Sequence, residues 1–172
     1  CATRRGDAPG RQAEVIVERP TYEPLLRIPR GLGCRVVRLP RRLEDDWAID
    51  MDRFASLVNR RTRLAILSNL HNPSGVRVPM ATLREMASLL ARVGTTLLVD
   101  EVYLESLFEA ETESCVHAGP NVLTTSSLTK AYGLDGLRAG WMLGPASLIE
   151  RIALAHDSVA GNGVAMGERM AL

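Results

Sequence analysis

The strongest constraint on the fold is an alternation of short apolar runs with longer amphipathic stretches. Each run holds five residues, mostly β-branched or aliphatic, and is flanked by proline, glycine or polar residues. Runs of this kind predict buried β-strands. The six predicted strands are Ala13–Val17, Arg35–Leu39, Leu64–Ser68, Thr95–Val99, Asn121–Thr125 and Ala139–Leu143.

Apolar residues at helical spacing lie between several of these runs. They predict helices over Met51–Asn59, Met80–Val93 and Leu148–His156, with Asp50 as an N-cap and Gly94 at a helix C-terminus. Strands that alternate with helices predict the α/β class, here a three-layer α/β/α arrangement around a mostly parallel sheet. The 172 residues are 46% hydrophobic and 24% charged, so we expect residues 1–172 to form one domain.

Charge and hydropathy exclude several kinds of partner. A net charge of +1 provides no strong field for nucleic acid, and no apolar run approaches the roughly 18 residues of a membrane-spanning helix. No charged-then-apolar leader is visible. Cys1, Cys34 and Cys115 are widely spaced and form no C-x-x-C motif, which favours reduced thiols over a disulfide framework. We therefore expect a cytoplasmic protein that binds neither nucleic acid nor a membrane.

The basic residues are almost all arginine. Of the 21 lysines and arginines, the only lysine is Lys130. An ammonium group can lose its proton and act as a nucleophile or form a Schiff base, whereas a guanidinium group cannot. A single lysine on the surface is the plain alternative, but the count marks Lys130 as a candidate for chemistry.

Chemically versatile residues come directly after the predicted strands. In an open parallel sheet, ligands bind beyond the carboxyl ends of the strands, so these residues are expected at one edge. Each has a structural explanation when taken alone, such as a turn for Asn72, a helix N-cap for Asp100 or a core aromatic for Tyr103. Their joint placement is what predicts a ligand site. In chain order the candidates are Tyr22, Asn72, Asp100, Tyr103, Ser127, Lys130 and Arg138.

Four segments of the chain resemble four motifs of one protein family, and they occur in the same order along the sequence. Residues 127–141 resemble the Schiff-base lysine segment of the fold-type I aminotransferases of classes I and II, which depend on pyridoxal 5'-phosphate (PLP). Ser127 stands three residues before Lys130, glycines follow, and Arg138 comes eight residues after the lysine. Residues 98–103 resemble the family's Asp-x-x-Tyr strand end, residues 69–75 its Asn-Pro-x-Gly turn, and residues 18–22 its Pro-x-aromatic element.

The resemblance implies that Lys130 holds PLP as a Schiff base and then acts as a general base for the proton shift. A lysine suited to this role needs a pKa lowered toward neutrality. Asp100 would pair with the pyridine nitrogen and keep it protonated, which makes the ring an electron sink.

The remaining roles implied by the resemblance concern binding of the cofactor. Asn72 and Tyr103 would hydrogen-bond its phenolic oxygen, and Tyr22 would stack on its ring. Ser127 and Arg138 would hold the phosphate, with Thr129 as a further contact. His71, next to Asn72, is given no role.

The resemblance covers nearly the whole chain but only the central part of the family's large domain. We therefore expect an incomplete PLP-binding domain that lacks the small C-terminal domain. Such a chain should be weakly active or inactive alone and homodimeric when full length. The implied function is amino-group transfer between an amino acid and a 2-oxo acid. A PLP-dependent lyase, decarboxylase or synthase, or a non-catalytic PLP-binding module, are the alternatives.

Overall fold

A six-stranded sheet organises the computed structural model, which describes residues 12–107, 112–160, 167, 169 and 170. The strand order is β2-β1-β3-β4-β5-β6. Strands β1 to β5 pair in parallel, and β6 runs antiparallel to β5. The strands are β1 (Glu14–Arg19), β2 (Arg35–Pro40), β3 (Thr62–Ser68), β4 (Thr96–Asp100), β5 (Val122–Ser127) and β6 (Gly140–Leu143). The mostly parallel α/β sheet expected from the sequence is confirmed.

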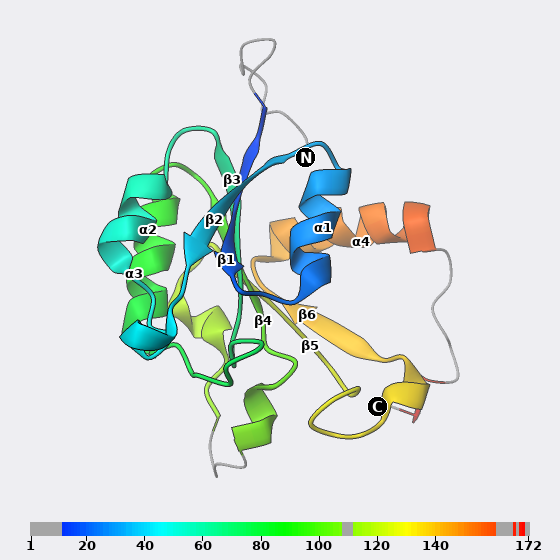
Figure 1. Ribbon diagram of the computed structural model, residues 1–172. Coiled ribbons are helices and arrows are strands. Elements are labelled where there is room, and N and C mark those ends of the chain that lie inside the picture. Colours follow the sequence, from blue (N-terminus) through cyan, green and yellow to red (C-terminus); the bar gives the residue numbers. More distant parts are fainter. Residues whose placement is uncertain (1–11, 108–111, 161–166, 168, 171–172) are drawn as a thin grey trace.

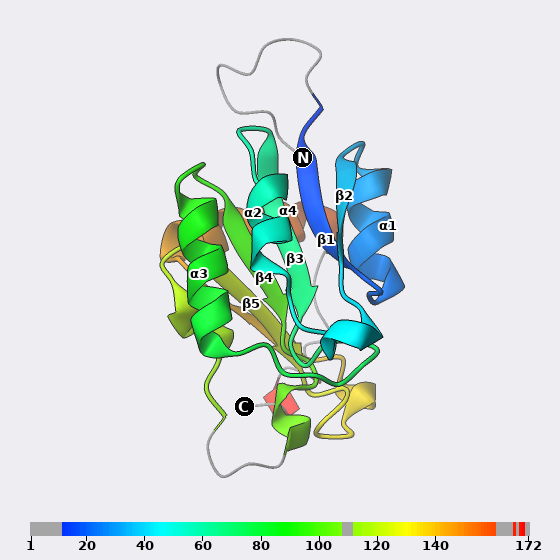
Figure 2. The ribbon, with the colours of Figure 1, turned by 60° about the vertical axis from the view of Figure 1, so that its left-hand side comes forward.

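Helices cover both faces of the sheet. They are α1 (Glu23–Gly31), α2 (Met51–Leu57), α3 (Met80–Ala91) and α4 (Ala146–Ala160). Figures 1 and 2 show α2 and α3 on one face and α1 and α4 on the other, which gives the three layers. Within the described residues, no helix combines the length and the apolar character needed to cross a bilayer.

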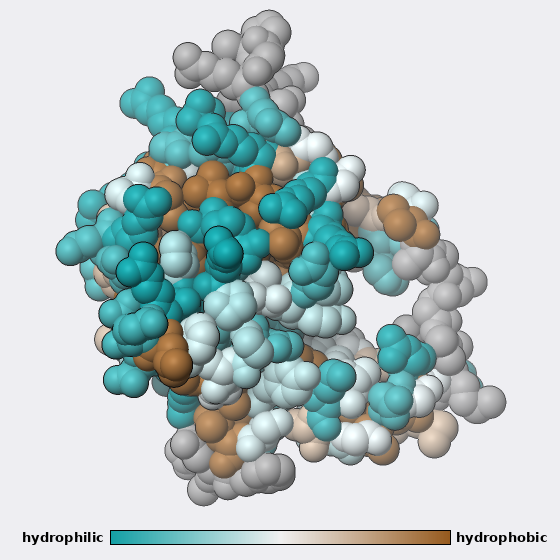
Figure 3. Space-filling view, viewed as in Figure 1, coloured by the Kyte–Doolittle hydropathy of each residue, from teal (hydrophilic) through white to brown (hydrophobic). Residues whose placement is uncertain are grey.

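The larger apolar core lies between the sheet and the pair α2 and α3. Phe54 of α2 and Leu83 and Leu90 of α3 are fully buried there, against Ile16 and Leu97 of the sheet. A smaller cluster on the opposite face packs Val15 and Val17 against the α1 side. Figure 3 shows a largely hydrophilic outer face over these layers, with hydrophobic residues between the hydrophilic ones.

The predicted N-cap at Asp50 is confirmed, whereas α3 ends at Ala91 with Arg92 as its C-cap, two residues before Gly94. The Asp50 side chain accepts a hydrogen bond from the Arg53 N–H at 2.8 Å, as an N-cap does. Gly94 adopts a φ of +63°, and its N–H donates to the Ala91 carbonyl just beyond the end of α3. Glycine suits this position because side chains rarely adopt a positive φ.

Helix α1 was not predicted from the sequence. Its nine residues include Pro24 and Pro29, which favour a loop when the sequence is read alone. Pro24 lies in the first turn, where its missing N–H removes no helical hydrogen bond. Pro29 lies two residues before the end of the helix and is buried against the sheet together with Leu26.

The expectation of reduced thiols is met at one cysteine and not at another. Cys115 is a free, buried thiol, and burial raises its pKa to about 12. Cys34 is disulfide-bonded, so the expectation is wrong there, whereas Cys1 lies outside the described residues.

Candidate active site

A cavity of about 310 Å³ opens at the carboxyl ends of β3, β4 and β5. Six of the seven predicted site residues line it, since the first turn of α1 and the loops after these strands converge there. The lining residues are Tyr22, Ser68, Asn72, Asp100, Val102, Tyr103, Thr125, Ser126, Ser127, Thr129 and Lys130.

Three of these residues form a row across the sheet. Ser68, Asp100 and Thr125 are register partners on β3, β4 and β5, so they lie side by side on neighbouring strands. Adjacent strands lie about 4.8 Å apart, which fixes the spacing of the row through backbone hydrogen bonds. The floor of the cavity is therefore positioned by the sheet itself.

Asp100 is a carboxylate that faces the cavity and has no oppositely charged partner within the described part of the chain. Its Oδ1 accepts hydrogen bonds from the Val102 N–H at 3.2 Å and from Thr125 Oγ1 at 3.4 Å. Burial raises its pKa above the ordinary value of 3.8, the hydrogen bonds oppose this, and nearby Glu101 adds to it. Among the described residues, no lysine or arginine is close enough to lower this pKa. The bond to Val102 closes a local turn and does not cap a helix, since the next helix, η2, spans Leu104–Leu107.

The amine and the hydroxyl groups of the cavity come from the segment after β5. Ser127 Oγ and Thr129 Oγ1 lie 2.6 Å apart, and the Thr129 N–H also donates to Ser127 Oγ. Lys130 follows at once; it is exposed, yet it lines the same cavity as Asp100 and Asn72. Hydroxyls and backbone N–H groups gathered beside an amine suit a phosphate ester.

The opposite walls of the cavity carry an aromatic ring, an amide and a phenol. Tyr22 is half exposed and caps the N-terminus of α1 through its backbone. Asn72 lies in the turn after β3, and its N–H donates to Ser68 Oγ at 2.9 Å. Tyr103 lies just after β4, before the 3-10 helix η2 (Leu104–Leu107).

Arg138 is the one predicted site residue that does not line the cavity. It is exposed, adopts a left-handed φ of +54°, and bonds through Nη1 to the Asp135 carbonyl at 3.3 Å. Conversely, the sequence did not single out Ser68, Val102 or Thr125, whereas Ser126 follows a predicted strand and is expected at this edge. Ser68 and Thr125 each end a predicted strand, and that position at the carboxyl end of a strand is the signal in the sequence that points to them.

The amine of Lys130 can form a Schiff base with an aldehyde, and the carboxylate of Asp100 lines the same cavity. Residues 8–167 match the family model described as aminotransferase class I and II, and the chain belongs to this family. Family members use PLP as their cofactor.

Individual relatives agree with this assignment. Arginine–pyruvate transaminase of Pseudomonas aeruginosa is 36% identical over 152 residues, covering 82% of this chain and 37% of the relative. Capreomycidine synthase of Streptomyces vinaceus is 31% identical over 162 residues, covering 92% and 41%. A PLP-dependent aminotransferase from Streptococcus suis superposes with a TM-score of 0.84 at 25% identity, covering 93% of this chain and 42% of that structure. The chain thus spans about two fifths of the length of these proteins.

The donor set of the cavity fits PLP. The carboxylate of Asp100 has an open position for a protonated ring nitrogen, because its Oδ2 makes no hydrogen bond to a described residue. The Lys130 amine can react with an aldehyde, and Ser127 and Thr129 offer hydroxyls to a phosphate.

Proposed function

We propose that this chain provides the PLP site of an aminotransferase, which moves an amino group between an amino acid and a 2-oxo acid. One observation carries the proposal: the chain's only lysine lines the same cavity as a carboxylate that pairs with no cation among the residues that the structure describes. Membership of the family supports the same reaction class.

Lys130 and Asp100 act on the reacting part of the cofactor. The Lys130 amine would hold the cofactor through its aldehyde group, and as a free amine it would serve as the base that takes and returns a proton at the substrate Cα. Asp100 accepts a hydrogen bond from the ring nitrogen and holds the proton there. PLP, when bound, supplies an electron sink for the charge that develops at that carbon.

The other residues hold and orient the cofactor. Ser127 and Thr129 bind the phosphate, and Arg138 adds its guanidinium. Asn72 and Tyr103 donate to the phenolic oxygen, while Tyr22 covers one face of the ring.

A second reaction on the same site is favoured by one relative. Capreomycidine synthase, 31% identical to this chain, is named for a synthase reaction and not for a transfer. A PLP-dependent synthase, lyase or decarboxylase would use Lys130 and Asp100 in the same way. The product distinguishes these reactions from transfer.

Trapping with borohydride tests the cofactor chemistry. The protein is mixed with PLP and reduced, and the adduct is mapped by mass spectrometry. We expect one adduct on Lys130 and none there in Lys130→Arg. As a control, Lys130→Arg with Arg84→Lys places a lysine on the exposed side of α3, where Arg84 is 58% exposed. Trapping at residue 84 as strong as at Lys130 would contradict a dedicated site.

A single-turnover assay separates transfer from the alternatives. PLP-loaded protein is mixed with one amino acid at a time, and the products are identified. Formation of a 2-oxo acid together with pyridoxamine phosphate supports transfer. Release of ammonia or carbon dioxide without pyridoxamine phosphate contradicts it and supports the second reaction class.

A further inference from the structure

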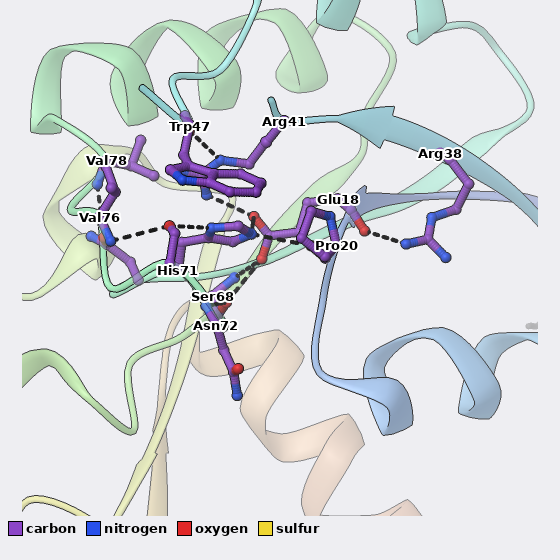
Figure 4. A network of polar contacts seen from close by, with 12 residues as sticks. Glu18, Pro20, Arg38, Arg41, Trp47, Ser68, His71, Asn72, Val76 and Val78 are labelled. Atoms are coloured by element: carbon purple, nitrogen blue, oxygen red, sulfur yellow. Dashed lines mark hydrogen bonds and ion pairs between the residues drawn. The ribbon is translucent and has the colours of Figure 1, made fainter. Parts of the chain in front are cut away.

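Glu18 is a fully buried carboxylate outside the cavity, near the end of β1. Its Oε2 lies 2.8 Å from Arg41 Nη1, in an ion pair whose two side chains are 0% and 1% exposed. Its Oε1 accepts hydrogen bonds from the Ser68 N–H at 2.6 Å and from Ser68 Oγ at 2.9 Å. Figure 4 shows Glu18 at the centre of this network. Neither Glu18 nor Arg41 lines the 310 Å³ cavity.

One branch of the network leads to Asn72. Because the Ser68 hydroxyl donates its proton to Glu18, its lone pairs remain to accept the Asn72 N–H at 2.9 Å. Figure 4 shows the Asn72 side chain pointing away from Glu18. Glu18 therefore fixes the backbone of a residue whose side chain lines the cavity.

The other branch leads through His71 toward Tyr22. Nε2 of His71 lies 3.1 Å from the Pro20 carbonyl oxygen, which can only accept, so this nitrogen carries the proton. Burial lowers the pKa of His71 and so favours the neutral ring, in which Nδ1 accepts from Ser74 Oγ at 2.6 Å. Glu18 Oε2 lies 3.7 Å from the same Nε2, too far for a hydrogen bond, so the buried carboxylate acts on the polar N–H of His71 through its charge.

The far side of the imidazole is closed by Trp47. Its ring centroid lies 5.9 Å from that of His71, and its carbonyl accepts from Arg41 Nε at 2.6 Å. The arginine that pairs with Glu18 thus also holds the ring that packs on His71. Among the described residues, this network joins the segment before Tyr22 to the turn that carries Asn72.

We propose that Glu18 is a positioning residue. It fixes the position of Asn72 relative to Tyr22, and these two residues line two walls of the cofactor cavity. This inference rests on the proposed function for its effect on PLP. Its structural core, the coupling of the two segments, can be tested without the cofactor. Glu18 acts through Ser68 and His71 and touches no reacting atom.

Glu18→Gln tests the proposal against Glu14→Gln. Glu14 lies at the start of the same strand, is 3% exposed, and pairs with Arg35 and Arg61 at 3.3 and 2.9 Å. Both changes remove one buried charge from β1, but only Glu18 contacts the network. In the cofactor-free protein, we expect Glu18→Gln to speed amide hydrogen exchange about tenfold more than Glu14→Gln over residues 19–25 and 66–73.

Two further variants each disrupt one branch of the network, through Ser68 or through His71. They also test the proposal if Glu18→Gln does not fold. Ser68→Ala keeps the ion pair and removes the hydroxyl that accepts from Asn72, so it should speed exchange over residues 66–73 only. His71→Phe keeps a ring against Trp47 and removes the bond to Pro20, so it should act mainly over residues 19–25. Uniform changes over the whole chain in both variants would overturn the proposal.

The cofactor supplies an independent readout. By titration of the absorbance of bound PLP, Glu18→Gln should weaken binding about tenfold relative to Glu14→Gln. Equal affinities together with equal exchange rates would overturn the positioning role. Failure of the unmodified protein to bind PLP would instead overturn the proposed function, and the exchange data would still decide the coupling.

Discussion

Thr125 donates a hydrogen bond to Asp100 at 3.4 Å from the neighbouring strand, and this is a weak partner for a partly buried carboxylate. Because Asp100 is partly buried and has only weak hydrogen-bond donors, ionising its carboxyl group costs free energy in the ligand-free protein. The same carboxylate is well placed to bind a cationic group of a ligand. A site that prefers a ligand in this way is expected to be less stable without it.

Asp100→Asn tests whether this carboxylate lowers the stability of the ligand-free protein while it raises the affinity for PLP. Because burial raises the pKa of Asp100 in the folded protein, the folded state holds this proton more tightly than the unfolded state. Stability is therefore lost as the pH rises above 3.8 and through the raised pKa. The amide cannot ionise, so we expect a higher free energy of unfolding at neutral pH, measured with urea. PLP affinity should fall roughly tenfold to a hundredfold because a charge-assisted bond is lost. A variant that is both less stable and unimpaired in binding would contradict this account.

The contribution of His71 to the free energy of unfolding changes with pH in the opposite direction to that of Asp100. Burial, aided by Arg41, lowers its pKa below 6.5, although the bond to Pro20 opposes this. Below pH 6.5 the unfolded chain takes up a proton that the folded imidazole resists, so stability falls as the pH falls. We expect the difference in free energy of unfolding between about pH 7.5 and pH 5.5 to be smaller in His71→Phe than in the unmodified protein. An identical difference in the two proteins would exclude His71 as the source.

Arg138→Gln tests the phosphate contact proposed for an arginine that lies outside the cavity. We expect binding of PLP to weaken about tenfold, since a charged hydrogen bond to phosphate is lost. Pyridoxal has the same ring and aldehyde but no phosphate, so its affinity should not change. A similar loss for both ligands would show that Arg138 acts on the fold or the ring and not on the phosphate.

Phe54→Ala measures the core between the sheet and the pair α2 and α3. Phe54 is completely buried in the larger cluster, and removing its ring leaves a cavity. We expect a loss of about 3–5 kcal/mol in the free energy of unfolding by urea. Leu154→Ala on α4 is the control, because Leu154 is 70% exposed and should change stability by less than about 0.5 kcal/mol.

The strands could be predicted because each is a short apolar run with polar ends. The strands predicted at Leu64–Ser68 and Thr95–Val99 are observed at Thr62–Ser68 and Thr96–Asp100, so they differ from the prediction by one or two residues at their ends. Helix α1 could not be predicted in this way, because its two prolines oppose a helix in isolation. Packing of Leu26 and Pro29 on the sheet decides the outcome, and that packing depends on distant residues.

The cavity was predicted better than the network behind it. Asn72, Asp100 and Lys130 follow strands, so one rule for parallel sheets places them together. Glu18 and Arg41 are 23 residues apart, and both look like surface charges in the sequence. Only the three-dimensional arrangement shows that they meet in the interior beside His71.

The row of Ser68, Asp100 and Thr125 limits how this site can change over evolution. Consecutive side chains of a strand point to opposite faces, so one residue inserted within β4 would turn Asp100 away from its neighbours. Substitutions and length changes in the loops beyond the strands avoid that penalty. New substrate preferences should therefore arise in those loops, while the lengths of β3, β4 and β5 stay constant.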